Sequence, residues 1–381
     1  MTVYHPPRRC LLLTIVIFAA VGLTAAACTG VTKPEGWASP ILSDDLLLVA
    51  HRDELFALDA ETLTPSWAFP LRGGDDELDV DALYGGLAVT DNTVFVPAYD
   101  GNLYALDLES GDIVQGWPFE TDGPLIGGVA VSSETAYFGS SDGKVYALDT
   151  GSLELRWAPF EAGDAVWSTP AVAGDTLYVT SLDGRLYALD AESGREMWSF
   201  KSAAGVTSPP VVDEQAGQVY VGGLDSRLRA IDIETHEENW SVKADNWFWT
   251  RPLVVDGVVY AGALDGRVYA VDAATGEARW PQPFETEAPV RAAAVMLGGM
   301  LIIIDRDGSV HGVDPQDGTA AVDAPTDIGA DVLADPLVRS TTDSDEGSNS
   351  EEIVLTTTEG ELVRIDAATL EIVGRKKLVG D

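Results

Sequence analysis

A short motif returns eight times along this chain at a nearly constant spacing. The copy DGRLYALD at residues 183–190 combines a tight Asp-Gly turn, a short alternating strand and a closing Asp. Successive closing aspartates are 40 to 52 residues apart, and they are Asp59, Asp107, Asp149, Asp190, Asp232, Asp272, Asp314 and Asp366. A period near 40 residues is typical of a propeller or a solenoid, in which each repeat buries its faces against its neighbours.

Each period contains four short segments with the character of β-strands. In the fourth period, TPAVAG (169–174) and TLYVT (176–180) precede the motif, and REMWSF (195–200) follows it. Asp-Gly between two alternating runs is the favoured signal for a two-residue hairpin, and no ten-residue stretch shows convincing helical periodicity. The sequence therefore predicts an all-β fold: an eight-bladed β-propeller over residues 37–381, with four antiparallel strands in each blade.

Tryptophan recurs eight residues after the closing Asp in five of the eight copies: Trp67, Trp157, Trp198, Trp240 and Trp280. In the second copy Trp117 comes two residues later, and the last two copies have Val322 and Gly374 at this position. A fixed register on an outer strand predicts that these rings dock between adjacent blades. The alternative is a sugar-stacking site.

The motif strand carries an aromatic side chain at one position, which we assign to the core of each sheet: Phe56, Tyr104, Tyr146, Tyr187 and Tyr269. His311 has the same position in the seventh copy, so it is interpreted as a tyrosine replacement and not as a metal ligand. His51 and His236 belong to other repeats. We therefore predict no metal centre built on histidine.

The repeat D-G-x-L/V-Y-A-L/V-D-x-x-S/T-G-x-x-x-W resembles that of the PQQ-like (pyrrolo-quinoline quinone) β-propeller family, over almost all of residues 37–379. The resemblance implies a quinoprotein-like propeller of eight blades. Quinone-dependent dehydrogenases of this superfamily commonly hold their cofactor with a vicinal Cys–Cys disulfide, a Trp floor, and Ca²⁺ with a catalytic Asp. The two cysteines of this chain, Cys10 and Cys28, are not adjacent. We therefore expect no PQQ, no other cofactor and no enzymatic activity.

The first residues are typical of an export signal. A basic segment is followed by the apolar run LLLTIVIFAAVGLTAAA and then by Cys28. This pattern resembles a bacterial lipobox, which implies a lipoprotein signal peptide at residues 1–27, a lipidated Cys28 and a short linker at 28–36. The alternative is an uncleaved transmembrane anchor. Several acyl chains on one N-terminus would hold the protein stably to the extracytoplasmic face of a membrane.

The charge balance is strongly acidic, with 62 Asp and Glu against 23 Lys and Arg and a formal net charge of −39. Such a surface repels phosphate backbones, which excludes nucleic acid as a partner. A basic protein, divalent cations or a salty medium fit better. The stretch Asp75–Asp81 could hold Ca²⁺ through Asp75, Asp76, Glu77, Asp79 and Asp81. Its spacing is not that of an EF-hand loop, so a solvated acidic loop is the favoured interpretation.

Aligning the innermost strands on their small-Pro step places Trp37, Trp167 and Trp249 in one register, with Val206, Leu83 or Tyr84, and Leu125 nearby. Arg251 and Arg291 fall in the next register, and Trp247 and Trp249 alternate with Phe248. These positions recur around the channel mouth of a propeller. They form either a layer of core side chains or an apolar rim for a partner's aromatic or extended segment, with the arginines able to receive a carboxylate.

These features favour a non-enzymatic, membrane-anchored, extracytoplasmic scaffold that binds envelope or extracellular proteins as a monomer. The PQQ-like family includes a lipoprotein of the outer-membrane β-barrel assembly machinery with a lipobox, eight blades and no cofactor, and the resemblance implies that envelope protein assembly is a candidate role. One alternative is an extracellular ligand- or polysaccharide-binding propeller, and a less favoured one is a PQQ-dependent dehydrogenase. Repeat similarity alone does not choose among these functions, because one fold hosts many.

Overall fold

The computed structural model describes residues 36–70, 78, 80–342 and 349–378. The signal peptide, Cys28 and nearly all of the linker lie outside the described residues, as do Asp75, Asp76, Glu77 and Asp79 of the acidic stretch. By its contacts the chain divides into residues 1–32 and 33–381, and the second unit alone is described below. No described segment forms a helix with the length and apolarity needed to span a bilayer.

The second unit contains eight separate sheets, each made of four consecutive antiparallel strands. Blade 1 contains β1 (Ile41–Ser43), β2 (Leu46–His51), β3 (Glu54–Asp59) and β4 (Pro65–Phe69). Blade 2 contains β5 (Ala88–Thr90), β6 (Thr93–Pro97), β7 (Asn102–Asp107) and β8 (Phe119–Glu120). Blade 3 contains β9 (Ala130–Ser132), β10 (Thr135–Gly139), β11 (Lys144–Asp149) and β12 (Phe160–Glu161). Blade 4 contains β13 (Ala171–Ala173), β14 (Thr176–Thr180), β15 (Arg185–Asp190) and β16 (Glu196–Lys201).

The second half of the unit repeats this arrangement. Blade 5 contains β17 (Val211–Asp213), β18 (Gln218–Gly222), β19 (Arg227–Asp232) and β20 (Glu238–Lys243). Blade 6 contains β21 (Leu253–Val255), β22 (Val258–Gly262), β23 (Arg267–Asp272) and β24 (Phe284–Glu285). Blade 7 contains β25 (Val295–Leu297), β26 (Met300–Ile304), β27 (Ser309–Val313) and β28 (Thr326–Asp327). Blade 8 contains β29 (Leu337–Thr342), β30 (Asn349–Thr356), β31 (Glu361–Asp366) and β32 (Ile372–Lys377).

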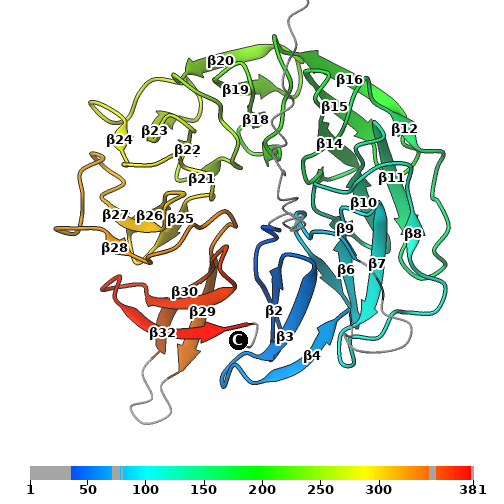
Figure 1. Cartoon of the computed structure of the whole chain (residues 1–381). Helices are drawn as coiled ribbons and strands as arrows, with labels where there is room; N and C mark the ends of the chain where they lie inside the picture. Colours follow the sequence, from blue (N-terminus) through cyan, green and yellow to red (C-terminus); the bar gives the residue numbers. More distant parts are fainter. Residues whose placement is uncertain (1–35, 71–77, 79, 343–348, 379–381) are drawn as a thin grey trace, which may run out of the picture. The chain divides into compact units, whose positions relative to one another are not determined.

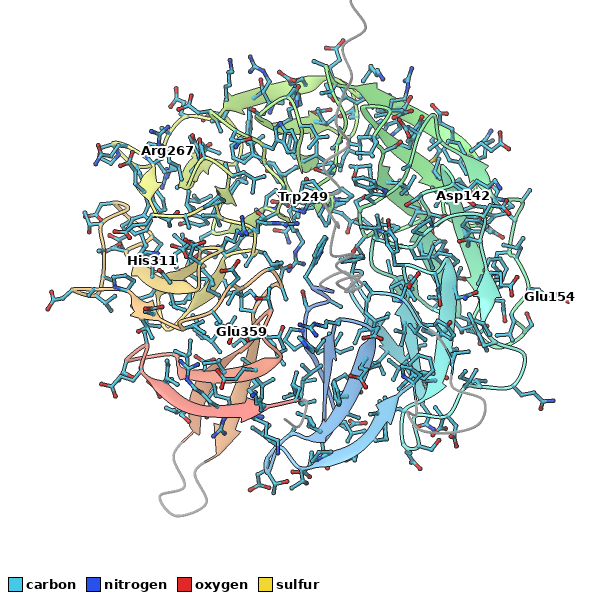
Figure 2. The ribbon with its side chains drawn as sticks, in the orientation of Figure 1. Asp142, Glu154, Trp249, Arg267, His311 and Glu359 are labelled. Atoms are coloured by element: carbon cyan, nitrogen blue, oxygen red, sulfur yellow. The ribbon has the colours of Figure 1, made fainter. Side chains whose placement is uncertain are left out.

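The eight sheets surround a central channel, which confirms the predicted eight-bladed propeller (Figure 1). The first strand of a blade, such as β21, lies toward the channel, and the fourth, such as β20, lies at the rim. Figure 2 shows the same division for side chains, with Trp249 near the axis and Arg267 at the rim. The buried side chains form apolar clusters within and between neighbouring sheets, as expected when no blade can bury both faces alone.

The ring closes where blade 8 meets blade 1, and within the described residues no strand is shared between these sheets. The backbone N–H of Asp335 donates to Ser39 Oγ at 3.0 Å across this seam. Apolar side chains of both blades form one cluster there, namely Leu47, Val49, Leu58, Leu63, Val354 and Leu362. Side-chain contacts and hydrogen bonds therefore hold the two ends of the array together.

The Asp-Gly turn is tied to the motif strand by a repeated hydrogen bond. Tyr187 Oη donates to Asp183 Oδ2 at 2.5 Å, and the same Tyr–Asp pair occurs in blades 2, 3 and 6. In blade 5 Arg229 replaces the tyrosine and forms an ion pair with Asp225. In blade 7 His311 stands at the tyrosine position, but its Nε2 lies 3.2 Å from Oδ2 of Asp305, two residues before the turn aspartate Asp307, so the bond is made to a different carboxylate.

Folding stability is expected to fall as the pH rises above about 10, the ordinary pKa of tyrosine. Burial first, and then the hydrogen bond to the turn aspartate, raises the pKa in four blades: Tyr104, Tyr146, Tyr187 and Tyr269. Because the folded-state pKa exceeds the unfolded one, this contribution to stability is complete below about pH 10 and is lost above it. Thermal unfolding at pH 8 and pH 11 should show a smaller difference in Tm for Tyr187→Phe than for the wild type. An equal difference would contradict this assignment.

The repeated tryptophans contact the following blade; Trp67, Trp198 and Trp240 lie in outer strands, whereas Trp157 and Trp280 lie three and four residues before theirs. The indole N–H of Trp240 donates to the carbonyl of Ala273 at 2.9 Å, and Trp67, Trp157 and Trp280 make the equivalent bond at 2.9 to 3.2 Å. Each acceptor is the residue directly after the closing Asp of the next blade. The fifth predicted docking residue, Trp198, instead stacks on the imidazole of His236, with ring centroids 4.7 Å apart.

The residue that faces this junction from the next blade, four positions after its closing Asp, differs in size according to whether a tryptophan is present. Four residues after the closing Asp the backbone has positive φ in every blade. The residue is glycine where the preceding blade presents an indole bonded as above, and a Cβ there would lie 2.4 to 2.7 Å from the ring: Gly111, Gly194, Gly276 and Gly318. It is leucine where the preceding blade has no tryptophan in register: Leu63, Leu153 and Leu370. These seven junctions therefore match residue size to the presence or absence of the indole, whereas at the junction of blades 4 and 5 His236 stacks on Trp198.

Candidate functional site

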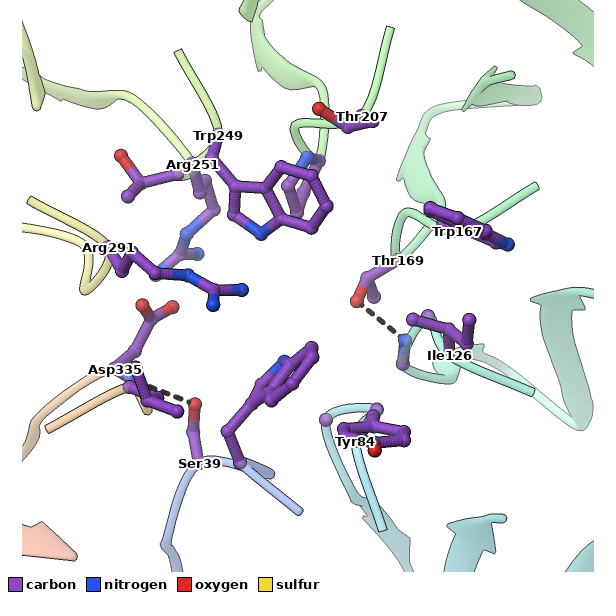
Figure 3. Close-up of a pocket in the computed structure, with 18 residues that line it drawn as sticks. Ser39, Tyr84, Ile126, Trp167, Thr169, Thr207, Trp249, Arg251, Arg291 and Asp335 are labelled. Atoms are coloured by element: carbon purple, nitrogen blue, oxygen red, sulfur yellow. Dashed lines mark hydrogen bonds between the residues drawn. The ribbon is translucent and has the colours of Figure 1, made fainter. Parts of the chain in front are cut away.

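Eight side chains form a ring at one mouth of the channel, one from each blade. Each lies four residues before the first strand of its blade, so the backbone places all eight at one height. We call them the upper tier, and they are Trp37, Tyr84, Ile126, Trp167, Thr207, Trp249, Arg291 and Leu333. All eight line one cavity of about 150 Å³ (Figure 3).

A second ring lies two residues further along each chain segment and is called the lower tier here. Its members are Ser39, Gly86, Gly128, Thr169, Pro209, Arg251, Ala293 and Asp335. Three of its backbone N–H groups donate to a side-chain oxygen of the next blade: Gly128 to Thr169 at 2.9 Å, Ala293 to Asp335 at 2.6 Å and Asp335 to Ser39 at 3.0 Å. These bonds fix neighbouring blades at the height of the cavity floor.

Between the tiers, Gly85 and Gly127 allow the backbones of adjacent blades to touch. A Cβ on Gly85 would lie 2.1 Å from the carbonyl oxygen of Gly127, and one on Gly127 would lie 2.5 Å from that of Ser168. No side chain fits at either position. These glycines therefore set how closely the blades approach around the cavity.

Arg291 is the cation of the upper tier. The centre of its guanidinium lies 4.7 Å from the ring centroid of Trp37 and 5.2 Å from that of Trp249, a distance at which cation–π attraction operates. Its Nε is buried and has no hydrogen-bond partner among the described residues. Burial first, and then the charge of Arg306, lowers the pKa of Arg291.

Two hydroxyls at the cavity also lack partners within the described chain. Thr207 and Thr250 are each 5% exposed, and neither Oγ1 forms a hydrogen bond. Buried polar atoms are nearly always paired. Three unpaired buried atoms around one cavity, counting Arg291 Nε, therefore mark a place where a ligand can supply the missing partners.

Among the described residues, Asp335 is the one acid that lines this cavity. Burial raises its pKa, while the hydrogen bond from the Ala293 backbone and the charge of Arg251 act in the opposite direction. From Trp37, in the blade next to that of Asp335, aromatic contacts lead outward from the cavity. The ring centroids of Trp37 and Tyr84 are 4.2 Å apart and those of Tyr84 and Tyr99 are 5.4 Å apart, and Tyr99 is 37% exposed.

The structure brings most of the sequence-predicted rim residues together. Trp37, Trp167, Trp249 and Arg291 belong to the upper tier, and Arg251 belongs to the lower tier. Trp247 does not line the cavity, since its side chain is 42% exposed and its carbonyl accepts a bond from the Leu264 N–H.

The predicted register was wrong at several positions. Arg251 and Arg291 do not share a register, because Arg291 occupies the tryptophan position of its own blade. Val206 and Leu125 lie one residue before the upper tier and are buried in the core, and of the alternatives Leu83 and Tyr84 it is Tyr84 that belongs to the upper tier. In blade 5 the alignment failed because two prolines are adjacent, and β17 begins after Pro210 rather than after Pro209. Counting back from the hairpin strands would have identified Thr207 and Leu333.

No group of three or more His, Cys, Asp or Glu side chains capable of holding a metal ion occurs within the described ranges. Of the five acids proposed for Ca²⁺ at Asp75–Asp81, only Asp81 is described. The three histidines discussed above lie in blades 1, 5 and 7. The chemistry available at the channel mouth is therefore that of indole rings, hydroxyls, guanidinium groups and one carboxyl.

Comparison with known proteins places the chain among characterised propellers. A family model described as "Outer membrane protein assembly factor BamB" matches residues 26–159, 160–235 and 215–377. No curated protein matches the chain. The crystal structure of BamB from Moraxella catarrhalis is similar with a TM-score of 0.67 and 18% sequence identity, covering 86% of this chain and 92% of that one. The computationally designed Ika8 protein is similar with a TM-score of 0.68 and 15% identity, covering 87% of this chain and 96% of that one. At these identities the two structures show a shared fold.

Proposed function

Because this chain belongs to the family described as outer membrane protein assembly factor BamB, we propose that it is a non-enzymatic protein-interaction scaffold of the cell envelope that takes part in outer-membrane protein assembly. The observation that carries the proposal is the extent of the family match, which spans residues 26–377 and all eight blades. A repeat array matched from end to end presents one continuous surface, and surfaces of this kind are used for binding.

The channel mouth supports a binding role. Its upper tier contains three tryptophans and one arginine, the residue types that dominate energetic hot spots at protein interfaces. The hydroxyls of Thr207 and Thr250 have no general base within hydrogen-bond distance in the described structure. A hydroxyl nucleophile requires such a base, so these groups are better suited to hold a ligand than to attack one.

We further propose that the propeller is tethered to the membrane through a lipid on Cys28, on the extracytoplasmic face. The residues before Cys28 have the order of a lipoprotein signal: basic segment, apolar run and small residues. A tether at this point leaves the propeller free to approach membrane-bound partners. The monomeric state and the absence of a cofactor belong to the same proposal.

Crosslinking pull-down of the full chain from membranes is expected to recover specific envelope proteins, including components or substrates of outer-membrane assembly. The double variant Trp249→Ala/Arg291→Gln is expected to recover them several-fold less well, because it removes an anchor ring and the cation beside it. Met197→Ala is the matched control, since Met197 is 43% exposed on the outer strand β16, away from the channel. Recovery no greater than that of an unrelated lipid-anchored protein would exclude the scaffold function.

A further inference from the structure

Arg291 at the channel mouth has no counter-ion among the described residues, although the chain is rich in acids. The formal net charge is −39, and most partly buried arginines in the described structure are paired with carboxylates, such as Arg229 with Asp225 and Arg339 with Glu352. Arg291 makes no ion pair with any described residue, and its guanidinium lies over the rings of Trp37 and Trp249. A partly buried charge without a partner is costly, so this site is built to receive an anion.

The unpaired donors of the cavity come from three consecutive blades, 5, 6 and 7. Figure 3 shows Arg291 and Thr207 on the two sides of Trp249, with the Arg291 side chain reaching into the ring of lining residues. The hydroxyls of Thr207 and Thr250 and the Nε of Arg291 are all potential donors. Each is buried and without a partner in the described structure. An anionic oxygen would pair a guanidinium N–H and a hydroxyl that are otherwise unpaired.

The surroundings favour a singly charged, flat group with an apolar body. Arg251, Arg291 and Asp335 line the cavity, so the formal charges of its lining sum to +1, which a single carboxylate would balance. A planar carboxylate matches the fork of a guanidinium group. The rest of the lining includes Trp37, Ile126 and Leu333, and the volume is about 150 Å³. An apolar cavity of about this volume can hold a benzene ring.

We propose that the channel mouth is a carboxylate receptor: Arg291 pairs with a single carboxylate whose small aromatic or aliphatic body packs among the upper-tier side chains. The carboxylate belongs either to an acidic residue next to an aromatic residue in a partner chain or to a small free acid. A carboxylate from a partner chain presupposes the scaffold function proposed above. The preference of the cavity for a carboxylate is independent of that function.

Titration calorimetry with the full chain tests this preference using benzoate and benzamide as probes. Benzoate is expected to bind at least tenfold more tightly than benzamide, which has the same shape without the charge. Arg291→Gln should weaken benzoate binding at least tenfold. Arg267→Gln is the control, because it removes the same charge from the rim of the propeller (Figure 2). Its benzoate affinity should stay within about twofold of the wild type, since salt screens a charge that far from the cavity.

The source of the carboxylate is distinguished by a second pair of probes, acetyl-Phe-Glu-amide and acetyl-Phe-Gln-amide. Preferential binding of the glutamate peptide supports a partner chain, and binding of benzoate alone supports a free acid. Thr250→Val, which exchanges a hydroxyl for a methyl, should weaken whichever acid binds several-fold without lowering Tm.

Three results would overturn the proposal: equal affinity for benzoate and benzamide, equal losses in Arg291→Gln and Arg267→Gln, or no binding of any acid. The comparison of benzoate with benzamide uses the wild-type protein alone, so it remains a valid test even if a substitution disturbs folding. Benzoate binding by a chain that recovers no envelope protein would refute the scaffold function while supporting the receptor.

Discussion

Replacing Trp240 with alanine is expected to lower the free energy of unfolding by about 3–5 kcal/mol, the usual cost of removing a buried tryptophan. The Trp240 ring is 8% exposed and packs in the cluster shared by blades 5 and 6. Its indole N–H also donates to the carbonyl of Ala273 in the next blade. The substitution therefore opens a cavity at a junction and removes a hydrogen bond that crosses it.

Trp247→Ala is the matched control, because it removes the same side chain from a position that is 42% exposed. Its effect should stay within about 0.5 kcal/mol, as for most surface substitutions. Denaturant unfolding followed by circular dichroism gives both values, provided the transitions remain two-state. Similar losses in the two variants would show that the outer-strand tryptophans do not stabilise the junctions.

Gly276→Ala is expected to destabilise the protein by about 2–4 kcal/mol, compared with about 1 kcal/mol for Gly257→Ala. Both glycines have nearly the same left-handed backbone, with φ of +71° and +73°. A Cβ on Gly276 would lie 2.7 Å from the Trp240 ring, whereas one on Gly257 would meet nothing within 4 Å. The backbone cost is therefore shared, and the difference reports the contact with the indole.

A double variant separates this contact from other effects. In the Trp240→Ala background the excess cost of Gly276→Ala over Gly257→Ala should disappear, because the ring that it meets is gone. A coupling energy of about 1–3 kcal/mol between positions 240 and 276 is expected from such a cycle. Additive effects would mean that the size match across the junction is incidental.

The sequence was sufficient to predict the eight sheets because hairpin chemistry and strand periodicity act locally. The motif at 183–190 ends at Asp190, and β15 ends at the same residue. The turn aspartates are followed by glycine in most copies, and their carboxylates accept bonds from the residues that follow. Because every blade repeats the same turn and motif strand, the position of each blade could be predicted from the spacing of the motif along the sequence.

The outer strands were less predictable, because proline interrupts them. Four blades have outer strands of five or six residues, such as β16 and β20. In the other four, β8, β12, β24 and β28 have two residues each. Each of these follows a segment with a proline near the strand: Pro118, Pro159, Pro283 and Pro325. Proline lacks the N–H that a ladder requires, so pairing resumes only beyond it.

The channel mouth could be predicted only in part. Its tryptophans could be recognised in the sequence because tryptophan is rare. Placing Thr207, Arg291 and Leu333 in the same ring requires knowing where the first strand of each blade begins. Strand starts are set by pairing with the second strand, not by proline: blades 2, 3 and 7 have Leu87, Val129 and Ala294 where the other five blades have proline. The lack of partners for Thr207 and Thr250 depends on contacts between blades and is invisible in the sequence.

The junction between blades 8 and 1 has a consequence for how such proteins change in size. Because each described sheet is complete in itself, an in-frame duplication or deletion from one closing aspartate to the next would add or remove a whole blade without rethreading the chain. Whether the altered array still closed would then depend on the wedge angle between neighbouring sheets. The side chains that pack at the junctions, such as Trp240 against Gly276, influence that angle, so we expect changes in blade number to be accompanied by substitutions there rather than in the strands.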